Sequence, residues 1–170
     1  RVDAHRGAGA SVAAAAGQLL LFLNDDTELI EPGSVDELAG LALEPGVGLV
    51  GAKLLFADGT LQHAGHVYPG LVTHALLGYD GDHPGPNNMA LLVRECSGVT
   101  AAAAMIRRDR FLAAGGLDES YPSNFNDVDL SLRLRRAGLR NLWTPHAAWY
   151  HVESATRVPT TTDAERDRLL

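Results

Sequence analysis

The sequence predicts an α/β fold, and three observations support this class. Short apolar runs, the clearest at 19–23 and 47–52, are typical of buried strands. Segments with helical spacing of leucine and alanine alternate with these runs, as at 34–44. The 170 residues are 46% hydrophobic and 21% charged, which is an ordinary composition for a protein with one globular core.

The first part of the chain is predicted to alternate helices and strands before a hairpin. Ser34 and Glu37 have the spacing of a capping box, in which the serine bonds the amide of Glu37 and the glutamate reaches back. In order, the expected elements are a helix at 10–16 ended by Gly17, a strand at 19–23, a helix from Ser34 to Pro45-Gly46, a strand at 47–52, and a hairpin of 53–56 with 60–64 around Ala57-Asp58-Gly59.

The second part is expected to begin with an irregular excursion and to end in strands. Asp127 and Asp129 lie in the first turn of a helix there, where the helix dipole favours anions, so simple capping carboxylates are one interpretation. Asp129 and Arg133 can pair one turn apart. The elements are an excursion at 65–89, a strand at 97–106, a short helix from 107 to Gly115-Gly116, a helix at 128–137 closed by Gly138, and strand segments at 141–145 and 147–151 around a proline kink.

Asn24, Asp25 and Asp26 follow the first buried strand at once. Side chains at the carboxyl end of an α/β strand face a ligand crevice. Neighbouring carboxylates repel one another unless a cation or a sugar hydroxyl lies between them, which favours a divalent metal that carries phosphates. The alternative is a strand end followed by an Asx turn, and the local pattern leaves both open.

The charge and the cysteine content exclude several classes of protein. With 21 acidic and 14 basic residues, the formal charge is -7 and the arginines form no basic face, so no nucleic acid partner is expected. Cys96 is the single cysteine, which excludes an internal disulfide and a thiolate zinc cluster. The apolar run before Asn24 is too short to span a membrane and lacks a cleavage site, so no targeting segment is expected.

Four histidines lie in or near the irregular excursion, at His63, His66, His74 and His83. Their spacing matches no tight helical or hairpin pair of metal ligands. Ordinary loop histidines are therefore favoured over a zinc site.

Five short motifs occur in a fixed order along the chain. They are Leu23-Asn24-Asp25-Asp26-Thr27, Gln62-His63-Ala64-Gly65, Gly115-Gly116-Leu117-Asp118-Glu119, Asn126-Asp127-Val128-Asp129-Leu130-Ser131-Leu132-Arg133 and His151-Val152-Glu153-Ser154. Their order and spacing over 9–157 resemble the family-two glycosyltransferases of the GT-A fold, particularly rhamnosyltransferase-like members. The resemblance implies a GT-A-type mixed, mostly parallel sheet flanked by helices and truncated at the amino end, with a partial domain at 1–157 and a polar tail at 158–170.

The resemblance also implies an activity and a cofactor. The expected reaction is the inverting transfer of a sugar from a nucleotide-diphosphate donor to an acceptor hydroxyl, in cell-envelope polysaccharide synthesis. By this match Asp26 and His151 hold a divalent metal, Mn2+ or Mg2+, while Asn24, Asp25 and Asp26 contact the donor. Asp127 matches the catalytic base, since an acceptor hydroxyl attacks poorly until a carboxylate takes its proton.

The remaining implications concern the acceptor and the partners. Gly116, Asp118, Glu119 and Asp129 match the acceptor side of the family site. The implied partners are a nucleotide-diphosphate sugar and a glycan or lipid-linked acceptor. The implied location is cytoplasmic, including the inner face of the membrane, with membrane association only through parts outside this chain.

The chain departs from the family pattern at two points, and these keep a second function open. Asn24 stands where the family has its first aspartate, which leaves one charge fewer for a metal. The strand, helix and strand that hold the nucleotide base are also not found before Arg1. The alternative is a non-catalytic or degenerate GT-A module for binding or assembly. A metal hydrolase is disfavoured because no activated nucleophile is visible.

Overall fold

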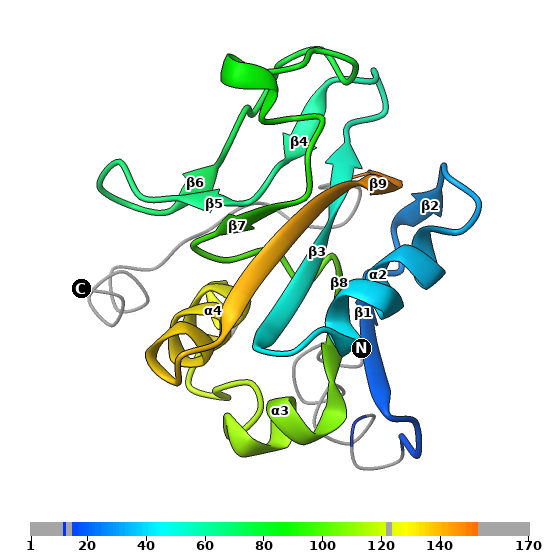
Figure 1. Ribbon diagram of the computed structural model, residues 1–170. Helices are drawn as coiled ribbons and strands as arrows, with labels where there is room; N and C mark the ends of the chain where they lie inside the picture. The colour runs from blue at the N-terminus through cyan, green and yellow to red at the C-terminus, as the bar shows by residue number, and fades with distance from the viewer. Residues whose placement is uncertain (1–11, 13–14, 122–123, 153–170) are drawn as a thin grey trace.

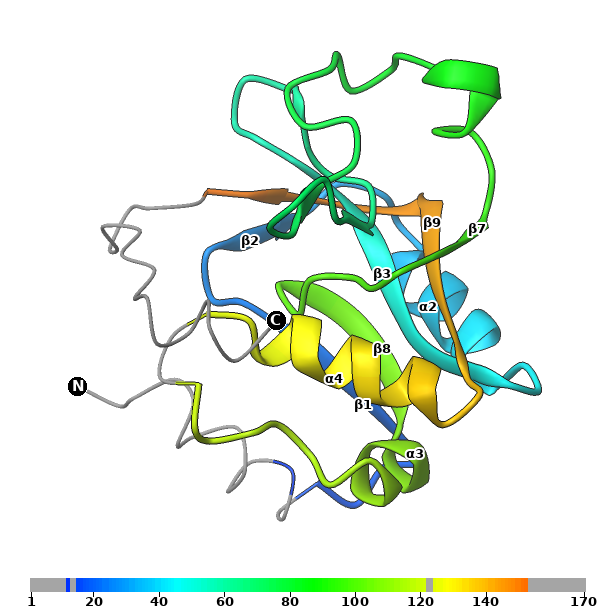
Figure 2. The same ribbon diagram turned by 90° about the vertical axis from the view of Figure 1, so that its left-hand side faces the viewer.

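A computed structural model describes residues 12, 15–121 and 124–152. Its main feature is a seven-stranded mixed sheet flanked by helices, so the predicted α/β class is confirmed (Figure 1, Figure 2). The main path has the order β1-β8-β3-β9-β2, while β4 pairs with β3 and β7 pairs with β9. The bounds are Leu19–Leu23 for β1, Thr27–Leu29 for β2, Val47–Leu55 for β3, Leu61–His63 for β4, Arg94–Cys96 for β7, Ala103–Arg107 for β8 and Arg140–His151 for β9.

The expectation of a mostly parallel sheet is wrong for the described strands. Among them only β3 and β9 pair in parallel, and the other pairings of the main sheet are antiparallel. A parallel pair needs a long crossover connection, and β3 and β9 have one because α4 lies between them in the sequence. Neighbours such as β3 and β4 are joined by a tight turn, which returns the chain in the antiparallel direction.

Helices cover both faces of the sheet and complete two apolar clusters (Figure 1). On one face, Leu38 packs in a cluster that includes Trp149. On the other face, Leu134 and Phe111 belong to a cluster around Trp143, which is fully buried. The helices are α2 (Ser34–Leu43), α3 (Arg108–Ala113) and α4 (Asn126–Arg136), close to the three helices predicted in these regions.

The predicted capping box at the start of α2 is wrong. The residue before the helix is Gly33, whose φ of 88° suits glycine, and it makes no side-chain cap. Ser34 Oγ donates instead to the carbonyl of Glu31 at 2.7 Å. Glu37 accepts a hydrogen bond from Thr144 Oγ1 at 2.8 Å, so its carboxylate joins the helix to β9.

β9 is one continuous strand with a bulge at the predicted proline kink. Ala52 of β3 pairs with Thr144, but the next residue, Lys53, pairs with Ala148. The three residues 145–147 are therefore left out of the parallel ladder, as expected near Pro145, which has no backbone N–H to donate. The two strand segments predicted at 141–145 and 147–151 therefore belong to the single strand β9.

The turn Ala57-Asp58-Gly59 forms the predicted hairpin between β3 and β4. The excursion that follows is irregular as expected, and its described elements are β5 (His66–Val67), β6 (Thr73–His74) and the 3-10 turn η1 (Pro86–Asn88). The predicted strand at 97–106 is shorter than expected, because 97–102 form a loop before β8. The predicted helix at 10–16 and the tail at 158–170 lie mostly or wholly outside the described residues.

Within the described ranges, no helix is both long enough and apolar enough to cross a membrane.

Candidate active site

The turn at 24–26 brings the predicted donor motif next to the end of β9. Thr27 Oγ1 donates to the carbonyl of Asn24 at 2.7 Å and closes this turn. β2 then pairs with β9 in a register that sets Thr27 opposite His151. Strand pairing between two distant segments therefore places Asp26 beside His151.

Asp26 and His151, the two predicted metal ligands, lie in contact. His151 Nε2 is 3.1 Å from Asp26 Oδ1. That oxygen is buried and has no hydrogen-bond partner among the described residues. Two ligands bound at about 2.1 Å to an octahedral ion are about 3.0 Å apart, so a divalent cation fits this pair. A protonated His151 would also satisfy the oxygen as an ion pair, and a metal titration separates the two states.

The other two residues of the predicted donor motif are exposed. Asn24 Nδ2 lies 3.1 Å from His151 Nε2, at the edge of the candidate metal site. Asp25 is exposed and accessible to a ligand. The structure thus brings Asn24 and Asp26 to the same imidazole nitrogen, and it leaves Asp25 facing solvent.

Asp127, the predicted base, is half-buried at the start of α4. Its Oδ2 accepts a hydrogen bond from the backbone N–H of Ala101 at 3.0 Å. Its Oδ1 accepts one from the N–H of Val128 at 2.8 Å. The two amides fix the orientation of the carboxylate, and the partial exposure of the side chain leaves room for a substrate to approach.

The loop residues Thr100, Ala101 and Ala102 join the donor motif to Asp127. The carbonyl of Ala102 accepts from the N–H of Asn24 at 3.0 Å, while the N–H of Ala101 donates to Asp127. The N–H of Thr100 donates to His63 Nε2 at 3.2 Å. Adjacent peptide groups thus join the predicted metal ligands to the predicted base.

The predicted acceptor residues lie in two different environments. Gly115 and Gly116 have φ angles of 84° and 75°, a left-handed turn that favours glycine. Arg133 donates to the carbonyl of Gly116 at 2.7 Å and pairs with Asp129 at 2.6 Å, as the one-turn spacing predicted. Asp129 therefore anchors the glycine turn through Arg133.

Asp118 and Glu119, the other predicted acceptor residues, are exposed beyond the glycine turn. Asp118 Oδ1 accepts a hydrogen bond from the N–H of Ser120 at 2.8 Å, which closes an Asx turn. Both carboxylates remain accessible, so these two residues keep the acceptor role as a prediction.

Three histidines converge beside the site, which their sequence spacing did not predict. His63, His66 and His74 each offer a nitrogen within 4.8 Å of the other two, because the β5–β6 pairing folds the excursion back. His63 Nδ1 lies 2.7 Å from His74 Nδ1. His83 is outside this cluster and stacks edge-on against Tyr79.

The hydrogen bonds of His63 disfavour a metal in the histidine cluster. Its Nε2 accepts from the backbone N–H groups of Gly65 and Thr100, at 3.3 and 3.2 Å, so the proton of the neutral ring sits on Nδ1. That proton points at His74 Nδ1. Burial, followed by the charges of the neighbouring histidines, sets the pKa of His63 well below its usual range, so the ring is neutral. The cluster is therefore a hydrogen-bonded pair next to a third ring.

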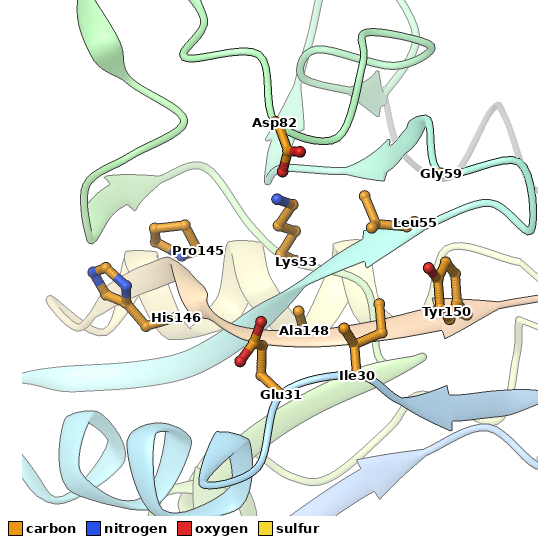
Figure 3. A pocket seen from close by; sticks show the side chains of 10 residues that line it. All are labelled: Ile30, Glu31, Lys53, Leu55, Gly59, Asp82, Pro145, His146, Ala148 and Tyr150. Atoms are coloured by element: carbon orange, nitrogen blue, oxygen red, sulfur yellow. The ribbon is translucent and has the colours of Figure 1, made fainter.

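A separate hollow of about 530 Å³ lies over β3 and β9 (Figure 3). It contains none of the predicted site residues. Lys53 points into it, and its Nζ donates to the carbonyl of Gly81 at 2.6 Å. The other lining residues are Ile30, Glu31, Leu55, Gly59, Asp82, Pro145, His146, Ala148 and Tyr150.

Solved structures define the class of the fold. The chain is similar to GalNAc-T7 crystallised with UDP, GalNAc and Mn2+, at a TM-score of 0.66 and 14% identity, over 89% of this chain and 31% of that chain. It is also similar to the mannosyltransferase PcManGT from Pyrobaculum calidifontis in complex with GDP-Man and Mn2+, at a TM-score of 0.59 and 12% identity, over 92% and 38%. The fold is therefore that of a GT-A glycosyltransferase.

Three bacterial proteins are similar to this chain in amino-acid sequence. Protein y4gI of Sinorhizobium fredii is 45% identical over 163 residues, which span 94% of this chain and 18% of the relative. The O-antigen biosynthesis protein RfbC of Myxococcus xanthus is 42% identical, over 84% and 12%. The N-acetylglucosaminyl-diphospho-decaprenol L-rhamnosyltransferase of Mycobacterium tuberculosis is 29% identical, over 71% and 42%. The chain is thus similar in sequence to proteins named for O-antigen biosynthesis and for L-rhamnosyl transfer, and similar in fold to GT-A glycosyltransferases.

This chain spans less than half the length of each of these relatives. No family model matches it.

Proposed function

We propose that this chain carries the metal and acceptor side of an inverting glycosyltransferase that moves a sugar from a nucleotide diphosphate to an acceptor hydroxyl. The acceptor is a glycan or a lipid-linked glycan in cell-envelope polysaccharide synthesis, made at the cytoplasmic side. One observation carries the proposal. The buried, unpaired oxygen of Asp26 lies 3.1 Å from His151 Nε2, and the loop that holds the Asp26 turn also holds Asp127.

The residues of the chain have distinct parts in this reaction. Asp26 and His151 would hold the cation, Mn2+ or Mg2+, and a cation bound there would supply positive charge to neutralise the departing diphosphate. Asn24 and Asp25 contact the donor from the exposed edge of the turn. Asp127, oriented by two amides, takes the proton of the acceptor hydroxyl.

The acceptor lies on the side of the glycine turn. Gly116 allows close backbone approach, while Asp118 and Glu119 present carboxylates to sugar hydroxyls. Asp129 acts there through Arg133, which binds the carbonyl of Gly116. The proposed domain is 1–157, with 158–170 as a polar tail.

The proposal is tested by changing Asp127 to Asn in the full-length parent protein. We expect sugar transfer to fall by about 100-fold or more, the usual contribution of general base catalysis, while donor binding stays unchanged. Transfer is followed with a radiolabelled nucleotide sugar, and donor binding by calorimetry. Asp109→Asn, at an exposed position on α3, is the matched control. Unchanged turnover in Asp127→Asn would remove this residue as the base.

One observation favours a second candidate, a non-catalytic binding or assembly module. Asn24 presents an amide nitrogen, and no charged oxygen, to His151. Calorimetry of this chain with Mn2+ and a panel of nucleotide sugars separates the two functions. Binding at or below millimolar ligand supports the transferase, and no binding at that concentration supports the module.

A further inference from the structure

Gln62 makes two hydrogen bonds to His151, and no role follows for it from the motif match. It lies on β4 and is only 3% exposed. Its Nε2 lies 3.2 Å from the carbonyl oxygen of His151, and its Oε1 lies 2.6 Å from His151 Nδ1. The buried amide of Gln62 thus binds both the backbone and the ring of His151.

These two contacts fix the tautomer of the imidazole. A carbonyl oxygen only accepts, so the amino end of the Gln62 amide must face the carbonyl of His151. The Gln62 oxygen then faces His151 Nδ1, and because this oxygen carries no hydrogen, Nδ1 must donate. In the neutral ring the proton is therefore on Nδ1, and the lone pair is on Nε2.

The lone pair is aimed at the candidate metal site. His151 Nε2 is 3.1 Å from Asp26 Oδ1 and 3.1 Å from Asn24 Nδ2. The amide of Asn24 can donate into this lone pair, and a cation that reaches Asp26 would replace that hydrogen bond. Because the Gln62 side chain is buried, solvent water does not reach its position to replace its hydrogen bonds to His151.

We propose that Gln62 is a positioning residue, which holds His151 in the Nδ1–H tautomer so that Nε2 binds a divalent cation together with Asp26. The inference rests on the proposed function, because it concerns the same metal site. Partners of this kind set ligand orientation, and losing one typically weakens metal binding by about 10- to 100-fold.

The test compares three variants of this chain. Gln62→Met removes both hydrogen bonds and keeps a similar volume, while Gln62→Glu keeps an acceptor for Nδ1. Gln18→Met makes the same substitution at an exposed glutamine and is the matched control. Thermal unfolding identifies any variant that fails to fold.

Two readouts are measured on each variant. The tautomer of His151 is read from nitrogen-15 chemical shifts of the histidine side chains without metal, and Mn2+ affinity is read by electron paramagnetic resonance. We expect wild type, Gln62→Glu and Gln18→Met to show the Nδ1–H tautomer and similar Mn2+ affinity. Gln62→Met should lose that tautomer and bind Mn2+ about 10-fold or more weakly.

The outcomes separate this inference from the proposed function. If wild type binds Mn2+ but Gln62→Met binds it equally well, or if wild type shows the Nε2–H tautomer, Gln62 is not the positioning residue and the proposed function stands. If wild type binds no Mn2+ at millimolar concentration, the metal site itself fails, and both proposals fail with it.

Discussion

His63 is a buried ionisable side chain whose surroundings accept only its neutral form. It is fully buried, and its Nε2 receives two backbone N–H groups, at 3.3 and 3.2 Å. A second proton on the ring would face those donors. Burial also lowers the pKa of His66, whose Nδ1 has no hydrogen-bond partner among the described residues. Both rings therefore link stability to pH.

We expect the free energy of unfolding to fall as the pH drops below about 6.5. In the unfolded chain each histidine has its ordinary pKa of 6.5, while burial lowers both values in the folded protein. Below pH 6.5 the unfolded state therefore binds more protons, and protonation favours unfolding by at most about 1.4 kcal/mol per pH unit for each ring. Urea unfolding between pH 7.5 and 5.0 measures the slope.

The variant His63→Gln keeps an acceptor for the two amides and cannot titrate. Its stability should depend less steeply on pH than that of wild type. Equal slopes in the two proteins would show that His63 is not responsible for the pH dependence.

At the scale of the elements, Arg133 connects α4 to the glycine turn after α3. Its guanidinium pairs with Asp129 at 2.6 Å and donates to the carbonyls of Ala114 and Gly116. The turn has no other described side chain that holds its carbonyls. The position of the predicted acceptor loop thus depends on one partly buried arginine.

Arg133→Ala should destabilise the protein by about 2–4 kcal/mol, because it leaves Asp129 without its ion pair and two carbonyls without their donor. Arg136→Ala, at an exposed position of the same helix, is the control and should change stability by less than about 0.5 kcal/mol. Chemical denaturation measures both. If Arg133→Ala lowers the free energy of unfolding no more than the control does, the glycine turn keeps its conformation without Arg133.

The loop at 97–102 packs closely against β3 where Val99 lies over Gly51. A Cβ atom built on Gly51 of β3 would lie 2.4 Å from Val99 Cβ, and Val99 is fully buried. Glycine at this position lets the loop that carries Ala101 approach the central strand. The same loop donates the N–H of Ala101 to Asp127, two residues after Val99.

Gly51→Ala should therefore destabilise the protein by about 1–3 kcal/mol, as overpacking of a core does, and it should weaken acceptor-side function in the parent protein. Gly40→Ala is the matched control, because a Cβ at Gly40 in α2 meets nothing within 4 Å. There alanine should stabilise the helix by up to about 1 kcal/mol. Thermal and chemical unfolding measure the pair, and destabilisation by both variants to the same degree would rule out the packing explanation.

At the scale of the whole molecule, β1 is an edge strand of the described sheet. It pairs with β8 on one side, and Leu21 and Leu23 on one of its faces are 37% and 48% exposed. An edge strand with exposed leucines can pair with another chain. This edge strand ends directly before the turn that carries Asp26.

We expect this isolated chain to self-associate through β1. The double variant Leu21→Lys/Leu23→Lys should shift it towards the monomer, because charged side chains disfavour pairing at an edge. Leu112→Lys is the control, since Leu112 is 51% exposed on α3, away from the sheet edge. Sedimentation velocity measures the association, and an equal effect of the control would place the contact elsewhere.

Local sequence determined the features that depend on neighbouring residues. The apolar runs specified β1 and β3, the Ala57-Asp58-Gly59 turn specified the hairpin, and the proline kink specified the bulge in β9. The order of five motifs also predicted the glycosyltransferase class. Local pattern failed at Ser34, where the capping spacing is present but the hydroxyl donates to the carbonyl of Glu31 and the N–H of Glu37 is taken by the carbonyl of Gly33.

Only the tertiary structure decided which of the predicted residues meet. Strand register brought Asp26 to His151, and β4 brought Gln62 to the same ring. The convergence of three histidines and the shared loop at 100–102 were equally hidden, because hydrogen bonds between distant segments leave no periodic signal in the sequence. The motifs therefore predicted the chemistry, and the pairing of strands brings the predicted residues together.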